Sequence, residues 1–247
     1  MPIMDNDDQP TWPARHTTEK ILAEREAFAR VGKIDIWYRE KMCKSISPDS
    51  QMFKREMWQN NYYSPEQFDT NGLSIYMAVD PAASESDKAD RTAIIVVGVN
   101  SAGHWFLLDC WAERKRPSDV MEAIFRIVSR WRPIIVGIEM VAYQAALEDF
   151  LFKEMPVRNI FFRIEKLRAA KKKELRIETA LQPRFATRSI WFPALTTWVS
   201  AIEEELLSFP HGLHDDRIDA LAYIEQIATV PVGAAFDEGS SEMICDI

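Results

Sequence analysis

The chain reads Ile75-Tyr76-Met77-Ala78-Val79-Asp80 at the start of its most regular region, an apolar run followed by a carboxylate. A second run of this kind, Ile134-Ile135-Val136-Gly137-Ile138, ends in Glu139. Short runs as apolar as these are typical of buried strands. A charge at the end of a buried strand is costly unless something compensates it. We therefore predict that both carboxylates face a common partner.

A third group of carboxylates opens the segment His214-Asp215-Asp216-Arg217-Ile218-Asp219-Ala220-Leu221, which we interpret as the start of a helix. Acidic residues are common helix caps, so capping alone would explain this segment in isolation. In isolation, Asp80-Pro81 is equally compatible with a strand that ends in a turn. Two strands that end in acids and one helix that begins with acids favour instead carboxylates that converge on divalent cations.

The order of predicted elements indicates an α/β fold, a mixed five-stranded sheet flanked by helices. Strands are predicted over 73–80, 91–100, 104–112, 134–139 and 159–164. Helices are predicted over 118–130, 144–153, 197–207 and 216–228. We divide the chain into an N-terminal arm over 1–71 with helices over 17–31 and 33–44, a main domain over 72–230, and an acidic flexible tail over 231–247.

Composition excludes several classes of protein. No apolar stretch of the 247 residues is long enough to span a bilayer, and the acidic N-terminus does not resemble a signal peptide. Cys43, Cys110 and Cys245 are far apart, which argues against a zinc ribbon or a disulfide framework and fits a reducing cytoplasm. No phosphate-cradling Gly-x-x-x-x-Gly-Lys loop is present, so we expect no ATPase activity from this chain.

Charge is distributed unevenly along the chain. The formal net charge is -8, yet residues 158–188 contain ten Lys or Arg against three Glu, a local net charge of +7. This asymmetry favours a DNA-binding segment, and the alternative is a solvated helix face. The residues that we expect to contact phosphates are Arg168, Lys171, Lys172, Lys173 and Arg176.

Carboxylates on rigid elements suit phosphodiester hydrolysis with two divalent metal ions, Mg²⁺ or Mn²⁺, which prefer oxygen ligands. Asp80 is the candidate bridging ligand, Glu139 would serve one metal, and Asp216 the other. Asp215 is an alternative ligand beside Asp216. Asp219 is either a ligand or a partner for a nearby basic residue.

The histidines near this segment are weaker candidates. His211 and His214 have helical spacing, but no cysteine or third histidine lies nearby to complete a zinc site. We expect His214 to act as an auxiliary residue that polarises water or contacts a phosphate.

Several segments resemble the C-terminal nuclease of the large terminase subunit of tailed bacteriophages, over about Trp12 to Ala228. The segments are Ala78-Val79-Asp80-Pro81-Ala82, Asp90-Arg91-Thr92-Ala93, Ile138-Glu139, Lys172-Lys173-Glu174-Leu175-Arg176-Ile177-Glu178, Phe209-Pro210-His211-Gly212 and His214-Asp215-Asp216-Arg217-Ile218-Asp219-Ala220. The last two together are the most specific.

The resemblance implies a ribonuclease H-like fold and an endonuclease that cuts concatemeric double-stranded DNA during genome packaging, in the cytoplasm of a bacterial host. It also implies that the acids matching Asp80, Glu139 and the Asp215/Asp216 pair bind the catalytic metals. A terminase motor domain or subunit, the small terminase subunit and the portal are the implied partners, and no membrane is involved.

Two departures from the family pattern stand out. No ATPase motor precedes Trp12, so we expect a split gene product, a prophage remnant or an excised domain. Ala186-Thr187-Arg188 also stands where the family usually has a turn glycine.

Two alternative functions stay open at this point. One is a junction-resolvase or transposase-like nuclease of the same fold, which would prefer branched DNA. The other is a non-catalytic module that docks onto the packaging motor. An actin-like or sugar-kinase ATPase is disfavoured because Pro81-Ala82-Ala83 lacks phosphate-binding glycines. Sequence specificity of cutting and oligomeric state are not indicated.

Overall fold

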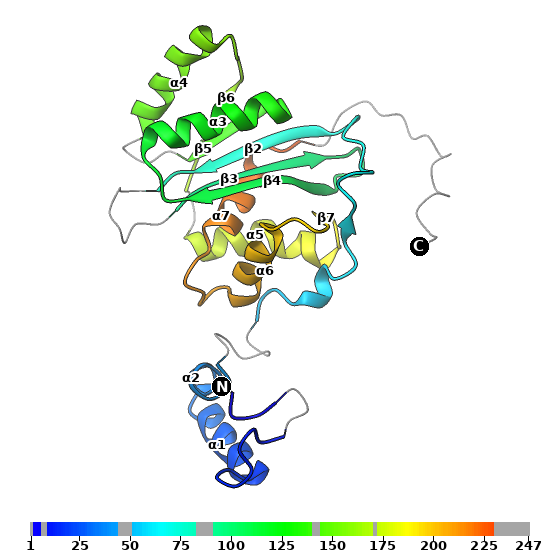
Figure 1. Ribbon diagram of the computed structural model, residues 1–247, viewed down its shortest axis with the longest axis vertical. Coiled ribbons are helices and arrows are strands. Elements are labelled where there is room, and N and C mark those ends of the chain that lie inside the picture. Colours follow the sequence, from blue (N-terminus) through cyan, green and yellow to red (C-terminus); the bar gives the residue numbers. More distant parts are fainter. Residues whose placement is uncertain are drawn as a thin grey trace. The chain divides into compact units, whose positions relative to one another are not determined.

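A computed structural model describes residues 2–5, 9–43, 51–82, 91–139, 144–169 and 172–229 (Figure 1). The chain forms two compact units. The first comprises Met1–Arg55 and Glu203–Asp215, and the second comprises Glu56–Ile202 and Asp216–Ile247. The boundary that we predict between residues 71 and 72 stays a prediction, and the predicted tail over 231–247 lies outside the described residues.

The first unit contains α1 (Thr18–Arg30), α2 (Ile34–Lys41) and the C-terminal part of α6 (Val199–Ser208). The Thr17 hydroxyl caps α1 by accepting a hydrogen bond from the amide of Lys20 at 3.4 Å. The predicted helix over 33–44 ends earlier, because Cys43 has a left-handed backbone with φ of 54°. Met4, Ile21, Trp37 and Tyr38 form one small buried cluster in this unit.

A seven-stranded mixed sheet forms the centre of the second unit. Its strand order is β1-β7-β4-β3-β2-β5-β6. The strands are β1 (Tyr62–Tyr63), β2 (Ser74–Asp80), β3 (Thr92–Val99), β4 (Trp105–Glu113), β5 (Ile135–Glu139), β6 (Ile164–Leu167) and β7 (Ile190–Pro193). The α/β mixed sheet is confirmed, but the predicted number of five strands is wrong, because the short strands β1 and β7 extend the sheet beyond β4.

The remaining helices mostly match the predicted ones. They are α3 (Pro117–Trp131), α4 (Gln144–Arg158), α5 (Lys173–Ala186), α6 (Val199–Ser208) and α7 (Asp216–Tyr223), with 3-10 turns η1 (Arg55–Met57) and η2 (Ile224–Gln226). Two assignments differ from prediction. The strand predicted over 159–164 lies later, as β6, and α5 was not among the predicted elements.

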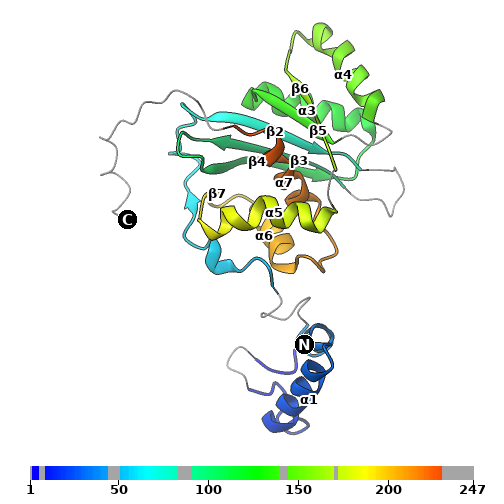
Figure 2. The ribbon, with the colours of Figure 1, turned by 180° about the vertical axis from the view of Figure 1, so that it is seen from behind.

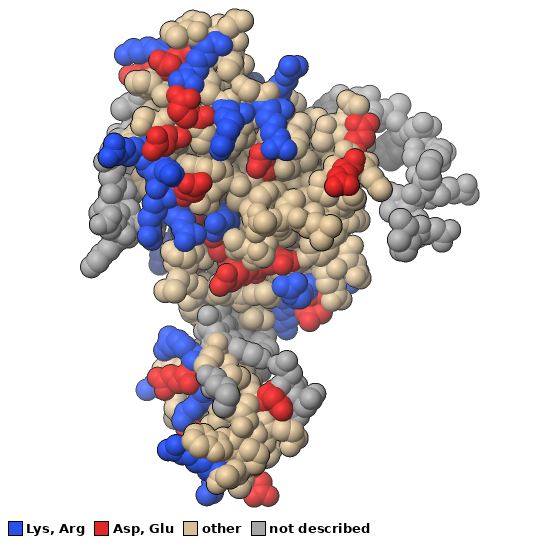
Figure 3. Space-filling view, in the orientation of Figure 1, with Lys and Arg blue, Asp and Glu red and all other residues tan. Residues whose placement is uncertain are grey.

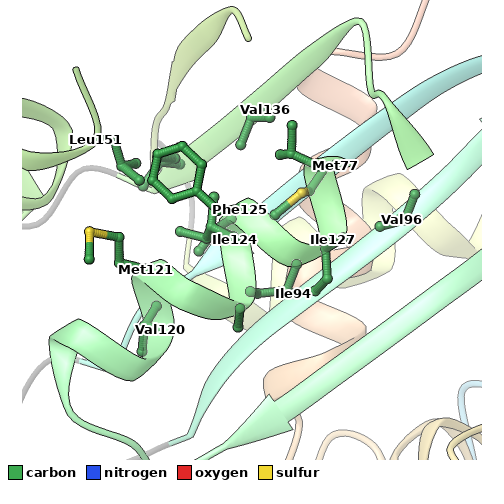
Figure 4. Close-up of a cluster of buried hydrophobic side chains, with 14 of the residues drawn as sticks. Met77, Ile94, Val96, Val120, Met121, Ile124, Phe125, Ile127, Val136 and Leu151 are labelled. Carbon is green, nitrogen blue, oxygen red and sulfur yellow. The ribbon is translucent and has the colours of Figure 1, made fainter. Parts of the chain in front are cut away.

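Helices cover both faces of the sheet. α3 and α4 lie over one face, and α5 and α7 lie over the other, with α7 against β2 and β3 (Figures 1 and 2). On the α3 side, Ile124, Phe125 and Ile127 interdigitate with Ile94 and Met77 of the sheet (Figure 4). α3 begins with Pro117 at its first turn and ends at Arg132, which adopts a left-handed backbone. This amphipathic helix therefore holds the central strands rigidly in register.

Strand direction places several strand ends at one edge of the sheet. β2 runs parallel to β5, and β5 runs parallel to β6. β3 is antiparallel to both β2 and β4, so β4 runs in the same direction as β2. The C-terminal ends of β2, β4, β5 and β6 therefore share one edge. In the described parts of the chain, no helix is both long enough and apolar enough to cross a membrane.

Candidate active site

Two of the predicted carboxylates meet at this shared edge. Asp80 is the last residue of β2, and Glu139 is the last residue of β5. The preceding residues, Val79 and Ile138, are register partners, so the two acids occupy adjacent positions on strands about 4.8 Å apart. Their carboxyl groups form a hydrogen bond with each other. The two strand-end acids thus lie next to each other. Their predicted role as metal ligands stays a prediction.

Burial and mutual repulsion set the protonation of this pair. Burial raises the pKa of Asp80 well above its usual range, and the hydrogen bond with Glu139 and the charges of Asp219 and Glu139 raise it further. Burial also raises the pKa of Glu139, but hydrogen bonds from Asp80 and Tyr223 and nearby positive charges outweigh it, so the pKa of Glu139 is lowered. The close approach of the two carboxyls therefore favours the protonated form of Asp80 and the ionised form of Glu139.

The acids at the start of α7 are held by cations from α5. Asp216 and Asp219 are each only 2% exposed. Arg176 forms a two-pronged pair with Asp219, from Nε to Oδ1 at 2.9 Å and from Nη2 to Oδ2 at 2.7 Å. Lys173 Nζ lies 3.5 Å from Asp219 Oδ2 and 4.0 Å from Asp216 Oδ1. Burial still raises the pKa of Asp219, against the lowering effects of Arg176 and Lys173.

Tyr223 connects the two halves of the site. Its hydroxyl donates a hydrogen bond to Glu139, and its ring lies under the Arg176 guanidinium, 4.2 Å from the ring centroid. Burial, followed by the hydrogen bond to Glu139, raises the pKa of the Tyr223 hydroxyl, which therefore stays protonated as a donor. We did not predict Tyr223 or the role of Arg176. The helical spacing of Asp216, Asp219 and Tyr223, which places them near one face of α7, is the signal that indicates Tyr223.

The structure places the predicted DNA-binding residues in different settings. Arg168 and Lys172 are exposed, as phosphate contact requires. Lys173 is half-buried and faces Asp216 and Asp219. Arg176 is buried against Asp219, so a phosphate contact is not available to its side chain without breaking that pair. Lys171 lies outside the described residues.

His214 and Asp215 belong to the first compact unit, whereas the other four predicted acids belong to the second. Their predicted roles, as an auxiliary residue and as an alternative ligand, stay predictions.

The acids present suit a divalent cation chemically. They supply carboxylate oxygens from two adjacent strand ends and one helix, the ligand type that Mg²⁺ and Mn²⁺ prefer. Within the described ranges, no group of three His, Cys, Asp or Glu side chains already has an arrangement that would hold a metal. An ammonium group faces two of the acids, because Lys173 Nζ lies 4.0 Å from Asp216 Oδ1 and 3.5 Å from Asp219 Oδ2.

The family described as the terminase RNaseH-like domain matches residues 77–225, which is more than half of the chain and includes every residue of this centre. The chain belongs to this family. The ribonuclease H-like fold expected from the sequence is thus confirmed, as is the resemblance to the nuclease domain of a large terminase subunit. The comparison with curated proteins found no match.

Solved structures similar to this terminase-family chain include the human cytomegalovirus terminase nuclease domain, Mn soaked and inhibitor bound, at 18% identity and a TM-score of 0.48. That alignment covers 70% of this chain and 92% of the other. The large terminase nuclease from thermophilic phage G20c with bound magnesium shares 13% identity, with a TM-score of 0.48 and coverage of 70% and 96%. The HK97 bacteriophage large terminase shares 12% identity with a TM-score of 0.49, and the alignment covers 90% of this chain and 54% of that one. These likenesses are too distant to support the assignment, which rests on the family match.

The shared proton makes the stability of the site depend on pH. The folded protein binds the Asp80 proton more tightly than the unfolded chain does. The free energy of unfolding therefore falls as pH rises above the ordinary pKa of aspartic acid, and it falls until the folded pKa has been passed. Asn at this position has no proton to lose. We therefore compare Tm values in the presence of a metal chelator. The Tm of Asp80→Asn minus the Tm of wild type should increase between about pH 5 and about pH 8.

The matched control for this measurement is Asp69→Asn, at an exposed carboxylate. The Tm difference between Asp69→Asn and wild type is expected to stay nearly constant over the same range. A difference for Asp80→Asn that shrinks with rising pH would contradict a raised Asp80 pKa.

The Arg176–Asp219 pair gives a second prediction. Arg176→Met leaves the buried Asp219 carboxylate without its guanidinium partner, which should cost about 3–5 kcal/mol of unfolding free energy in urea titrations. Removing both charges, in Arg176→Met with Asp219→Leu, should recover most of this loss. Arg163→Met, which breaks an exposed pair with Glu165, should cost at most about 1 kcal/mol. Equal losses for Arg176→Met and Arg163→Met would show that the buried pair is not a structural element of the site.

Proposed function

We propose that this chain is a divalent-metal-dependent DNA endonuclease that cuts concatemeric viral DNA during genome packaging, by two-metal-ion phosphodiester hydrolysis. The observation that carries the proposal is the contact between the Asp80 and Glu139 carboxyls at adjacent strand ends, within a chain of the terminase RNaseH-like family. Two half-buried carboxyls in contact at adjacent strand ends repel each other when both are ionised, so they are poorly suited to a purely structural role. A divalent cation held by both would offset that repulsion.

Asp80, Glu139 and Asp216 are the residues that would hold the two metal ions, Mg²⁺ or Mn²⁺. Bound there, such ions would supply a hydroxide nucleophile at neutral pH and neutralise the departing oxyanion. Asp80 would be suited to hold both ions because it is fixed at the end of β2, an interior strand of the sheet. Of the two alternatives raised for Asp219, the supporting role is favoured, because both of its oxygens already accept from Arg176.

The residues around the acids orient them. Tyr223 holds Oε1 of Glu139 through its hydroxyl. Partners of this kind fix the rotamer of a ligand and raise the affinity of a metal site. Lys173 balances the negative charge of Asp216 and Asp219. The Lys173 ammonium and a metal cation would repel each other at short range, because both are positively charged. We infer that the ammonium group would turn toward a substrate phosphate if cations were bound.

The wider context of the activity is also part of the proposal. A terminase motor domain or subunit, the small terminase subunit and the portal are the proposed partners, and the cytoplasm of the bacterial host is the proposed location. The proposal assigns ATP hydrolysis to a motor and not to this chain.

Plasmid nicking tests this proposal. Wild-type protein should nick supercoiled double-stranded DNA with Mg²⁺ or Mn²⁺ and stop in excess EDTA. Ca²⁺, with longer bonds and looser geometry, should not support turnover. Asp80→Asn, Glu139→Gln and Asp216→Asn should each abolish nicking while retaining the fold, and Tyr223→Phe should lower the rate about 10–100-fold.

The control for these variants is Glu66→Gln, at an exposed carboxylate outside the centre, which should nick at the wild-type rate. Cleavage that persists in excess chelator, or wild-type rates from all three acid variants, would overturn the proposal. A strong preference for branched over linear DNA would favour a junction-resolvase-like nuclease instead. Absence of nicking with every metal would favour a docking module.

A further inference from the structure

A group of exposed cations lies at the same sheet edge as the candidate site, outside the segment nominated from the sequence. Arg114, Lys115 and Arg116 form the turn between β4 and α3, and all three side chains are exposed. Below, this group is called the β4–α3 basic turn. It contrasts with the 158–188 segment, where Arg176 and Lys173 face carboxylates of the protein itself.

Strand register locates this turn relative to the carboxylates. Asp80 pairs with Ala93 of β3, and Ala93 pairs with Ala112 of β4. Arg114 follows two residues after Ala112, so the turn begins about 7 Å beyond the level of Asp80, at the rise of an extended chain. Two strand spacings separate β4 from β2, which places the turn about 10 Å to the side of Asp80. Figure 3 shows Lys and Arg side chains gathered over this end of the sheet, at the left of the view.

The described contacts of Lys115 and Arg116 are weak. Lys115 Nζ lies 3.5 Å from a carboxylate oxygen of Glu113, but both side chains are about half exposed, and exposed pairs contribute little. Arg116 is the N-cap of α3 and makes no side-chain cap hydrogen bond. Cations at a helix N-terminus oppose the helix dipole, so this placement costs stability. An anionic partner would offset that cost.

The opposite flank of the site also carries exposed cations. Arg168 directly follows β6, whose Leu167 pairs with Glu139 of β5. Arg168 and Lys172 are both exposed. Four strand spacings, or about 19 Å, separate β4 from β6, with the Asp80–Glu139 pair between them. Over that length of its axis, a DNA duplex carries about eleven phosphates.

We propose that the β4–α3 basic turn binds the phosphate backbone of duplex DNA, which lies across the sheet edge from Arg114–Arg116 to Arg168 with the carboxylates beneath it. This inference rests on the proposed nuclease function and adds the path of its substrate. Contacts of this kind give affinity and orientation without reading sequence.

A salt titration of duplex binding tests the path separately from cleavage. Binding of a linear duplex in EDTA is measured for wild type and for the triple variant Arg114→Gln/Lys115→Gln/Arg116→Gln. Each lost phosphate contact should reduce the slope of log affinity against log salt by about 0.9, or about 2.7 for three contacts. The affinity ratio of wild type to variant should therefore shrink about 40-fold between 50 and 200 mM salt.

The matched control removes three cations toward the other end of the same helix, in Arg126→Gln/Arg130→Gln/Arg132→Gln. These residues are exposed, and α3 ends toward the start of β5, at the opposite edge of the sheet. The control should keep the wild-type slope. A second variant, Arg114→Lys/Arg116→Lys, retains the charge of the turn and should also keep it, which separates phosphate binding from damage to the fold.

The outcomes distinguish this inference from the function on which it rests. An unchanged slope in the Gln variant, or an equal loss in the control, would overturn the DNA path. If wild type still nicks plasmid in Mg²⁺ in that case, the nuclease function stands and only the path is wrong. A wild-type protein that neither binds nor cuts DNA would overturn both.

Discussion

The hydrogen bond between the carboxyl groups of Asp80 and Glu139 is the interaction on which the rest of the site depends. Two half-buried carboxylates that lie side by side repel each other, so ionisation of both is costly unless a cation joins them. Parallel pairing of β2 with β5 forces this contact, because Val79 and Ile138 share a register position and each acid follows directly. The packing of α3 against the sheet supports the strands that carry the two acids.

The positive groups around the pair follow from the same constraint. α7 brings two further buried acids to this edge, and α5 supplies Arg176 and Lys173 to balance them. Tyr223 ties the two helices to the strand pair, since it donates to Glu139 and packs under Arg176. Four carboxyl groups therefore lie at this edge, a concentration of acids typical of a functional centre.

Regular apolar patterns in the sequence made the longer strands, helix α3 and the strand-end acids predictable. β2, β3, β4, β5 and α3 each carry a clear apolar period, and the acids at strand ends follow from reading where those runs stop. The shortest elements were missed, because β1 has two residues and β7 has four, too few to show alternation. The region that includes α5 was recognised only by its charge, and Pro183 inside the helix obscures its period.

The pairings within the site were less predictable than the acids themselves. Arg176 meets Asp219 across 43 residues of sequence, and Tyr223 meets Glu139 across 84. Only tertiary packing brings these partners together. The sequence of a basic run such as 171–176 therefore does not show which Lys and Arg side chains pair with distant acids and which face solvent. For the same reason the β4–α3 basic turn, with only three cations, did not stand out until the strand register placed it at the edge that holds Asp80.

An anomalous diffraction map from crystals soaked in Mn²⁺ would test the central claim most directly. The account predicts manganese bound by the carboxylates of Asp80, Glu139 and Asp216, with Arg176 still paired to Asp219 and the hydrogen bond between Asp80 and Glu139 gone. Crystals of Asp80→Asn should lack this density. Wild-type crystals at saturating Mn²⁺ that retain the Asp80–Glu139 hydrogen bond and show no manganese at the sheet edge would contradict it.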